Sequence, residues 1–366
     1  MTTKLNTIAS NFVLEGVISS IDGLGQGFIN DTFIIRTEGD APDYILQRKN
    51  KAIFPDVPAM MDNIDRVTAH IRKRVIAEGG DPMREVMTII PTHDGKFYHI
   101  DEEGEYWAVC IFISDTVAYD SANSEELARM GGMGIGKFQA QLADFNEPLA
   151  EVIKGFHNIK HRFVQWDEAL AQDLAGRKAS LATEIDWIES RREEMLGFWT
   201  KVESGEIPLR VTHNDTKINN ILFDHEGKVL CVIDLDTVMS APTLNDFGDA
   251  IRTYTNTGAE DAEDLSTVSM ALPMFAAYAD GYLSQRATTL TKSELDHLAF
   301  SARYITFEQV LRFLMDYING DTYYKIKSPN HNLVRTHAQY ALLQSIEAQY
   351  DEMCKVIEEL SAKYLA

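Results

Sequence analysis

The pattern of apolar residues changes once along the chain, and this change constrains the fold more than any other feature. Up to about Ile113, short runs with alternating apolar residues are separated by Gly, Asn and Asp, which predicts strands and tight turns. One segment in this part, between Phe54 and Gly80, has apolar residues at helical spacing. From about Tyr119 onward the spacing is helical, except for a strand–loop–strand segment from Leu209 to Val238. We therefore predict an α+β fold of two lobes: a small antiparallel sheet with one helix over residues 1–114, and a larger helical lobe over residues 115–366.

The composition argues against several classes of protein. Of the 366 residues, 45% are hydrophobic and 25% are charged, which is typical of a globular chain. The formal net charge is −22 and no Lys/Arg cluster occurs, so we expect no nucleic-acid partner and no anionic membrane surface. The cysteines Cys110, Cys231 and Cys354 lie far apart, which indicates reduced thiols instead of a disulfide framework. With no signal-peptide core and no segment of membrane-spanning length, we expect a cytoplasmic protein; the oligomeric state stays open.

The strand–loop–strand segment contains the residues most suited to chemistry. The stretch "RVTHNDTKINNILFD" has short apolar flanks and a middle that is polar throughout. Burying so many hydrogen-bonding groups costs free energy unless they have partners or a use. Within this stretch, His213, Asp215 and Asn220 have the spacing His-x-Asp-x-x-x-x-Asn. The strand "VIDLD" follows after a short hairpin and adds Asp234 and Asp236.

This set of residues suits phosphoryl transfer. The reaction needs an acceptor for the proton of the nucleophile, oxygen ligands for Mg²⁺ and cations near the phosphates. The loop offers the Asp215 carboxylate, the Lys217 ammonium and the Asn220 amide, and Asp234 adds a second hard oxygen ligand. The alternative is a polar hairpin whose Asp and Asn residues only cap turns. Two motifs paired at this separation favour the catalytic interpretation.

The paired motifs resemble the catalytic loop of the protein-kinase-like superfamily, in the version found in aminoglycoside phosphotransferases and related small-molecule kinases. The longer string "THNDTKINNILFD…VIDLDTVM…DFGDAIR" is similar to the N-acetylhexosamine 1-kinases, as are "YILQR", "DTVAYD", "GFHN" and "RFLMDYINGDTYY". The resemblance implies a bilobal protein-kinase-like fold and the use of ATP and Mg²⁺. It also implies phosphorylation of the 1-hydroxyl of N-acetylglucosamine or N-acetylgalactosamine, with the sugar as the small-molecule partner.

The resemblance also assigns roles to the motif residues. Asp215 would be the catalytic base that orients the acceptor hydroxyl, and Lys217 would face the transferred phosphate. Asn220 and Asp234 would hold Mg²⁺. Supporting positions behind these residues fall to His213, Asp236 and Asp246. The "DFG" triplet that begins at Asp246 is not the metal-binding triplet of protein kinases, because "VIDLD" already supplies the metal aspartate.

The β-rich part contains a candidate nucleotide site. "DGLGQGFINDTF" resembles the family's glycine-rich nucleotide loop, which implies roles for Gly25, Gln26, Gly27, Asn30 and Thr32, although such hairpins are also common without a ligand.

The third strand departs from the family pattern. Most relatives have a Lys or Arg there, and "YILQR" aligned by its apolar frame places Gln47 at that position with Arg48 beside it. Strand alternation lets only one of the two face the site. Either Arg48 reaches it through a small bulge, or Gln47 hydrogen-bonds the phosphates and the positive charge comes from elsewhere. No counterpart of the usual helix glutamate is found. The adenine ring is expected against the segment from Trp107 to Ser114, which includes Ile113, and against Ile35, Ile45 and Ile233.

The acceptor site is expected in the helical lobe. Aromatic faces beside hydrogen-bonding groups suit a sugar, and the resemblance points to Arg312, Tyr317 and Tyr324, together with Asp215. Asp249 and Arg252 also come within reach, although an intrahelical ion pair explains them equally well.

Other functions stay open at this point. The acceptor hydroxyl could belong to homoserine, choline or an aminoglycoside, or the chain could be a nucleotide-binding pseudokinase. His157 and His161 have the i, i+4 spacing of zinc ligands, but no third ligand lies nearby in the sequence, so no zinc site is predicted.

Overall fold

The computed structural model describes residues 2–25 and 29–366. The chain forms two compact units, one built on a sheet and one mainly helical, which confirms the α+β class. The first unit comprises Met1–Ala118, Gln141–Lys154 and Asn220–Ser240, and the second comprises Tyr119–Ala140, Gly155–Asn219 and Ala241–Ala366. This division differs from a single boundary after residue 114, because the first unit takes up two later segments that pack with the sheet region.

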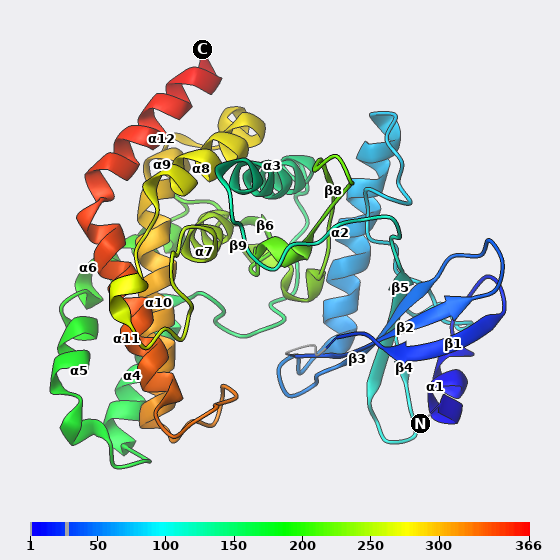
Figure 1. Cartoon of the computed structure of the whole chain (residues 1–366), viewed down its shortest axis with the longest axis horizontal. Coiled ribbons are helices and arrows are strands. Elements are labelled where there is room, and N and C mark those ends of the chain that lie inside the picture. Colours follow the sequence, from blue (N-terminus) through cyan, green and yellow to red (C-terminus); the bar gives the residue numbers. More distant parts are fainter. Residues whose placement is uncertain (1, 26–28) are drawn as a thin grey trace. The chain divides into compact units, whose positions relative to one another are not determined.

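Among the described residues, the main sheet of the first unit has five antiparallel strands in the order β1-β2-β3-β5-β4 (Figure 1). A short connection joins β2 to β3, as the alternating runs predict. The elements of this region are α1 (Thr2–Ala9), β1 (Ile18–Gly23), β2 (Asp31–Thr37), β3 (Tyr44–Lys49), α2 (Val57–Ala77), β4 (His99–Ile100) and β5 (Tyr106–Ile111).

The two faces of β3 have different surroundings. Tyr44 and Leu46 are buried in an apolar core that also contains side chains of α1 and β5. Ile45, Gln47 and Lys49 alternate with them and line a cavity on the opposite face. The period of two along this strand therefore separates structural from cavity-lining residues.

Helix α2 lies beside the sheet (Figure 1), and its Met61 and Ile64 line the same cavity. Its first turn is capped by Asp56, whose carboxylate accepts a hydrogen bond from the Ala59 N–H at 3.0 Å, and Pro58 lies in that turn. The expected helix between Phe54 and Gly80 is confirmed. Its apolar stripe is buried at Met60, Ile64, Val67, Ile71 and Val75.

The strand–loop–strand segment contributes a hairpin to the first unit. Strand β7 (Ile221–Phe223) pairs with β8 (Val229–Val232), and the 3₁₀ turn η3 (Leu235–Thr237) follows. Phe223 exchanges two backbone hydrogen bonds with Val117 at 2.8 and 2.9 Å, which joins the hairpin to the end of the sheet segment. Asp234 has φ 59° and ψ 58°, a left-handed conformation that few non-glycine residues adopt.

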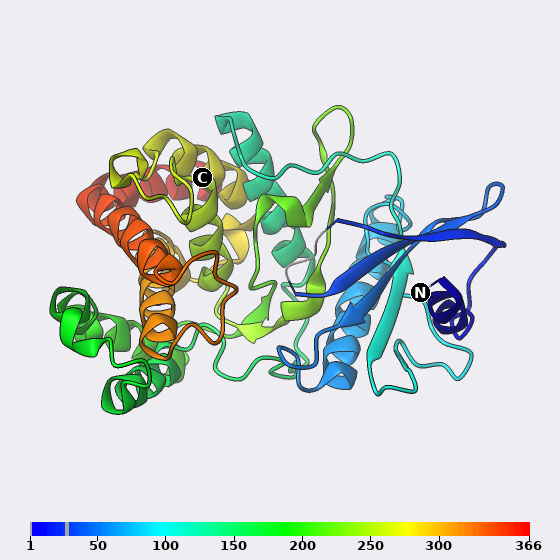
Figure 2. The same ribbon diagram turned by 60° about the horizontal axis from the view of Figure 1, so that its bottom comes forward.

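The second unit is built around helix α10 (Leu298–Ile318), almost all of which is buried. Helices α4, α7 and α11 pack against it (Figures 1 and 2). A Cβ on Gly248 of α7 would come within 2.3 Å of the Ser301 carbonyl oxygen, so the glycine of "DFG" permits close helix packing. The remaining elements are α3 (Glu125–Gln141), α4 (Ile159–Gln172), α5 (Ala182–Glu189), α6 (Arg192–Glu203), β6 (Arg210–Thr212), β9 (Met239–Ala241), α7 (Leu244–Tyr254), α8 (Leu272–Arg286), α9 (Lys292–Asp296), α11 (His331–Ala348) and α12 (Tyr350–Leu365).

In the described part of the chain, no helix is both long enough and apolar enough to cross a membrane.

Candidate active site

The loop that follows β6 is held by a buried aspartate on α7. Asp246 accepts hydrogen bonds from the N–H groups of His213 at 3.0 Å and Asn214 at 2.7 Å, and from the Gln139 side chain at 2.7 Å. Burial raises the pKa of Asp246, although these donors oppose the shift. Asp246 thus occupies the supporting position that the family resemblance implies, below the backbone of the motif.

The next residues of the loop are fixed in the same way, whereas the carboxylate of Asp215 is left accessible. The Asp215 N–H donates to Nδ1 of the buried His213 at 3.2 Å, and the Thr216 N–H donates to Asp249 at 3.1 Å. The Asp215 side chain is 28% exposed, with one carboxylate oxygen 3.1 Å from Nζ of Lys217. A rigid backbone therefore presents one accessible carboxylate beside a cation.

Two charged residues of α7 lie behind this loop. Asp249 and Arg252 form a buried ion pair at 2.9 Å, and Arg252 also contacts Glu260 at 3.0 Å. Burial opposes ionisation of Asp249, but Arg252 and Lys217 lower its pKa below the ordinary value. Burial likewise opposes the charge of Lys217, yet Asp215 and Asp249 raise its pKa. Asp249 therefore holds both the loop and Arg252, whereas Arg252 contacts Asp249 and Glu260.

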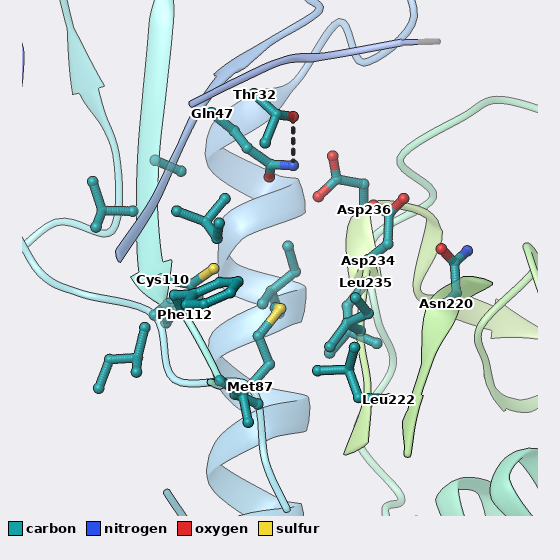
Figure 3. Close-up of a pocket in the computed structure, with 18 of the residues that line it drawn as sticks. Thr32, Gln47, Met87, Cys110, Phe112, Asn220, Leu222, Asp234, Leu235 and Asp236 are labelled. Carbon is teal, nitrogen blue, oxygen red and sulfur yellow. Dashed lines mark hydrogen bonds between the residues drawn. The ribbon is translucent and has the colours of Figure 1, made fainter. Parts of the chain in front are cut away.

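The first unit contains a cavity of about 260 Å³ with one polar end (Figure 3). Most of its wall is apolar and comes from β3, β5, α2 and the β7–β8 hairpin. Burial raises the pKa of the Cys110 thiol to about 11, so this side chain is uncharged at neutral pH and belongs to the apolar wall. Most polar groups gather at the other end (Figure 3), where Lys49 contacts Gln47 and Asp236; these residues are Thr32, Gln47, Lys49, Asn220, Asp234 and Asp236. Thr116 is a further polar residue of the wall.

Lys49 is the cation of this cavity, and the sequence analysis missed it. Its side chain is 4% exposed, and Nζ lies 2.7 and 2.9 Å from the two carboxylate oxygens of Asp236 and 2.7 Å from Oε1 of Gln47. Asn30 donates to the same Asp236 carboxylate at 2.7 Å. The strand therefore does carry a lysine, two residues after Gln47 on the same face, and its acidic partner comes from η3 instead of a helix.

Arg48 does not line the cavity. It points to the same face of β3 as Tyr44 and Leu46, opposite the cavity, and its exposed guanidinium pairs with Asp31. The alternative in which Arg48 supplies the charge is wrong for this geometry, because adjacent strand residues point to opposite faces. The period of two along a strand is the sequence signal for Lys49, because residues 47 and 49 must face the same side.

The other residues predicted for the nucleotide site differ in where they lie relative to the cavity. Thr32 and Ile113 line the cavity, whereas Asn30 is buried beside it and also accepts from the Asn50 N–H at 3.0 Å. Gly25 has φ +66° with open space around it, and Gln26 and Gly27 lie outside the described residues. Ile45 and Ile233 contribute to the wall, but Ile35 is buried in the core on the opposite face of the sheet.

Asn220 and Asp234 are suitable ligands for a hard cation. They are the last residue of the 3₁₀ turn η2 (Ile218–Asn220) and the residue before η3, and both line the cavity of the first unit. Within the described residues, no group of three or more His, Cys, Asp or Glu side chains forms a metal cluster. One carboxylate and one amide fit Mg²⁺, which keeps several ligands from water or substrate phosphates. The strained backbone of Asp234 is the kind of outlier that concentrates at functional positions.

A second cavity, of about 370 Å³, lies in the second unit between α4 and the end of α10. Arg312 lines it, with its guanidinium carbon 5.6 to 5.8 Å from the ring centroids of Phe156, Tyr323 and Tyr324. Burial opposes the charge of Arg312, yet Tyr324 and Glu308 raise its pKa. Tyr324, which also lines the cavity, accepts from the Gln309 amide at 3.2 Å.

Tyr317 does not line this cavity. Its hydroxyl donates to Asn330 at 3.1 Å, and Arg177 lies over its ring at 4.1 Å. Because it follows Arg312 by five residues, it lies on another side of α10. The structure therefore brings Arg312 and Tyr324 together and excludes Tyr317.

Solved structures with the same fold are known. A spectinomycin phosphotransferase in complex with ADP and spectinomycin has a TM-score of 0.58 at 12% identity, with 96% of this chain and 99% of that chain covered. An aminoglycoside phosphotransferase from Alicyclobacillus acidocaldarius has a TM-score of 0.57 at 14% identity, covering 95% and 96%. A Plasmodium vivax ethanolamine kinase has a TM-score of 0.51 at 10% identity, covering 88% and 81%. These likenesses confirm the kinase-like fold.

The sequence itself matches a family description. The model of the phosphotransferase enzyme family, abbreviated APH, matches residues 20–282, which is more than half of the chain. That range includes the strand β3, the loop with Asp215 and the strand "VIDLD". The chain belongs to the phosphotransferase enzyme family.

Proposed function

We propose that this phosphotransferase uses ATP and Mg²⁺ to phosphorylate the anomeric 1-hydroxyl of N-acetylhexosamines, releasing ADP and the sugar 1-phosphate. Family membership supports phosphoryl transfer to a small molecule. The ADP in the spectinomycin phosphotransferase complex supports ATP as the donor. The choice of a sugar rests on the second-unit cavity.

In this proposal the cavity of the first unit receives ATP. Its apolar wall suits the adenine ring, and its polar end suits the phosphates, with Lys49 as the buried cation. Asn220 and Asp234 would hold Mg²⁺, which supplies charge stabilisation on the phosphate oxygens when bound. Lys49 would give up part of its pairing with Asp236 to reach the phosphates.

The loop of the second unit supplies the acceptor chemistry. Asp215 would orient the sugar hydroxyl and accept its proton, since its carboxylate is accessible while its backbone is fixed. Lys217 would offset the charge that develops on the transferred phosphoryl group. His213, Asp246 and Asp249 would keep the loop in position without touching the substrate.

The single observation that favours a sugar is the aromatic frame around Arg312. Sugars present apolar C–H faces to aromatic rings and accept directional hydrogen bonds from a guanidinium. The buried acid of this cavity, Asp316, already accepts hydrogen bonds from the N–H groups of Thr322, Tyr323 and Tyr324 at 2.8 to 3.0 Å. Glu168 also lines this cavity and is exposed, so the preference for a sugar rests on the aromatic frame around Arg312 and not on a lack of carboxylates.

An amino-alcohol or aminoglycoside acceptor is the second candidate. Two of the similar structures favour it, because one is an ethanolamine kinase and the other a spectinomycin phosphotransferase. Their likeness concerns the fold, so we rank this candidate below the sugar.

ADP release with Mg²⁺-ATP, measured over a panel of acceptors, separates these functions. The panel holds N-acetylglucosamine, N-acetylgalactosamine, glucose, galactose, homoserine, choline and kanamycin. We expect turnover of the two N-acetyl sugars, followed by NMR assignment of the phosphate to the 1-position. Turnover restricted to choline or kanamycin would overturn the sugar assignment. ATP binding without any turnover would favour a pseudokinase.

A further inference from the structure

Asp246 holds backbone N–H groups of the catalytic loop, whereas a different residue lies against the backbone carbonyl of Asn214. Asn214 has φ +65°, a left-handed conformation that must be held by its surroundings. Its N–H is held by Asp246 at 2.7 Å, and its amide side chain donates to Oγ1 of Thr212 at 2.9 Å. Its carbonyl oxygen lies 3.5 Å from Nε2 of His157. Rotation about this residue would redirect Asp215, the next residue in the chain.

His157 is itself held in place from two sides. It is 4% exposed and has φ +55°, which is uncommon for a non-glycine residue. Its Nδ1 lies 2.6 Å from a carboxylate oxygen of Glu308 on α10. Its carbonyl oxygen accepts the Tyr304 hydroxyl at 2.7 Å, one turn earlier on the same helix. Helix α10 thus fixes both the ring and the backbone of His157.

Glu308 is a buried acid that fold stability alone does not explain. Its side chain is 1% exposed, and its second oxygen accepts from Nε of Arg162 at 2.9 Å. Buried ion pairs contribute little to stability compared with apolar residues of the same volume, and their best-supported use is to select one geometry. Here the selected geometry includes the ring of His157 against the catalytic loop.

We infer that His157, aligned by Glu308, is a positioning residue that sets the Asn214 carbonyl and so directs the Asp215 carboxylate toward the acceptor. Arg162 also lines the second-unit cavity, so one chain of contacts runs from that cavity through Glu308 and His157 to the loop. This inference rests on the proposed function in taking Asp215 as the base. It adds a role for the "GFHN" segment that neither the ATP cavity nor the acceptor cavity supplies.

Two conservative variants separate positioning from simple support. His157→Gln places an amide N–H where Nε2 lies and keeps the contact with Asn214, whereas His157→Asn keeps the Nδ1 contact with Glu308. Asn tolerates the left-handed backbone better than Gln. We therefore expect His157→Asn to be the more stable variant and His157→Gln the more active one. The kcat of His157→Asn should fall about 10²-fold, as for a misplacement of roughly 1 Å, with KM for ATP unchanged.

Hydrogen–deuterium exchange at residues 213–217 is the second readout, because it needs no substrate. Exchange should be faster in His157→Asn than in His157→Gln. Activity that follows the order of thermal stability, or wild-type kcat and exchange in His157→Asn, would overturn the inference. If neither variant folds, Glu308→Gln decides, since it keeps an acceptor for Nδ1–H: about tenfold lower kcat with faster exchange supports positioning, and no change in either overturns it.

The same measurements separate this inference from the proposed function. If the wild-type chain turns over none of the acceptors, the proposed function fails, and the exchange comparison still tests the positioning role. If it turns over a different acceptor, the kcat comparison is made with that acceptor.

Discussion

The cavity of the first unit has one polar end and a long apolar wall, whereas in the cavity of the second unit charged, amide and aromatic side chains are mixed. The first arrangement suits a ligand with a flat apolar part and a charged tail. The second suits a ligand whose polar groups point in several directions. Under the proposed function, the two cavities would therefore select their ligands differently: the ATP cavity by separating apolar from polar surface, and the acceptor cavity by the directions of its hydrogen-bonding groups.

The loop around Asp215 resembles the second cavity, because several hydrogen bonds of fixed direction hold its backbone. Removing its one accessible carboxylate is the strongest way to test the comparison. Asp215→Asn should lower kcat about 10²–10⁴-fold, since the amide cannot accept the hydroxyl proton. Nucleotide affinity, measured by titration calorimetry, should stay at the wild-type value. Asp186→Asn, on the exposed surface of α5, is the control and should leave both quantities unchanged.

The polar end of the first cavity depends on one cation, so its loss should have the next largest effect. Lys49→Met should lower kcat/KM for ATP about 10²–10³-fold. It should also destabilise the fold, because Asp236 is left buried without its cation. Arg48→Met is the matched control on the same strand, and steady-state kinetics should show wild-type values. Equal losses in both variants would contradict the assignment of Lys49.

Substitutions in the second cavity should change the KM for the acceptor and leave the KM for ATP unchanged. Arg312→Met should raise KM for the acceptor about 10- to 100-fold, the range expected for losing a hydrogen bond to a charged group, with KM for ATP unchanged. Tyr324→Phe should have a smaller effect of the same kind. Tyr317→Phe is the matched control because its hydroxyl contacts Asn330 outside the cavity. A raised acceptor KM in that control would show that the two tyrosines were assigned the wrong way round.

The smallest expected effect is on the free energy of unfolding at low pH, tested with one carboxylate from each unit. Burial opposes ionisation of Asp101 in the first unit and Asp280 in the second, yet their donors lower each pKa from 3.8 to about 2. The stabilisation is therefore present above pH 4 and is lost as the pH falls toward 2. Asp101→Asn or Asp280→Asn should each lower the unfolding free energy by about 1–2 kcal/mol at pH 7. Urea titrations should show this difference disappear near pH 2, and a constant difference would contradict the assignment.

Local patterns were enough to predict the helices and strands and two residues of the first cavity. Period-two and helical spacing predicted the sheet, α2 and the strand–loop–strand segment. The motif spacing identified Asn220 and Asp234, which both line the first cavity. Such features are encoded within a few residues of one another, so a single sequence reveals them.

The features that were not predicted depend on which way a side chain points or on contacts between residues far apart in the sequence. Lys49 was missed because the apolar frame of β3 was aligned without following its alternation past Gln47. Tyr317 was grouped with Arg312 because closeness along α10 does not show which side of the helix a residue occupies. The contact of His157 with Glu308 joins residues 151 positions apart, which no local pattern reports.

The interleaving of the two units has a consequence for how the protein is made. The chain passes from one unit to the other after residues 118, 140, 154, 219 and 240. A nascent chain that has left the ribosome only as far as residue 219 carries the glycine-rich segment, Lys49 and Asp215, but neither Asn220 nor Asp234. If Asn220 and Asp234 hold Mg²⁺ as proposed, a fragment truncated after the sheet lacks both ligands, and Mg²⁺-ATP should stabilise that fragment less than it stabilises the full chain.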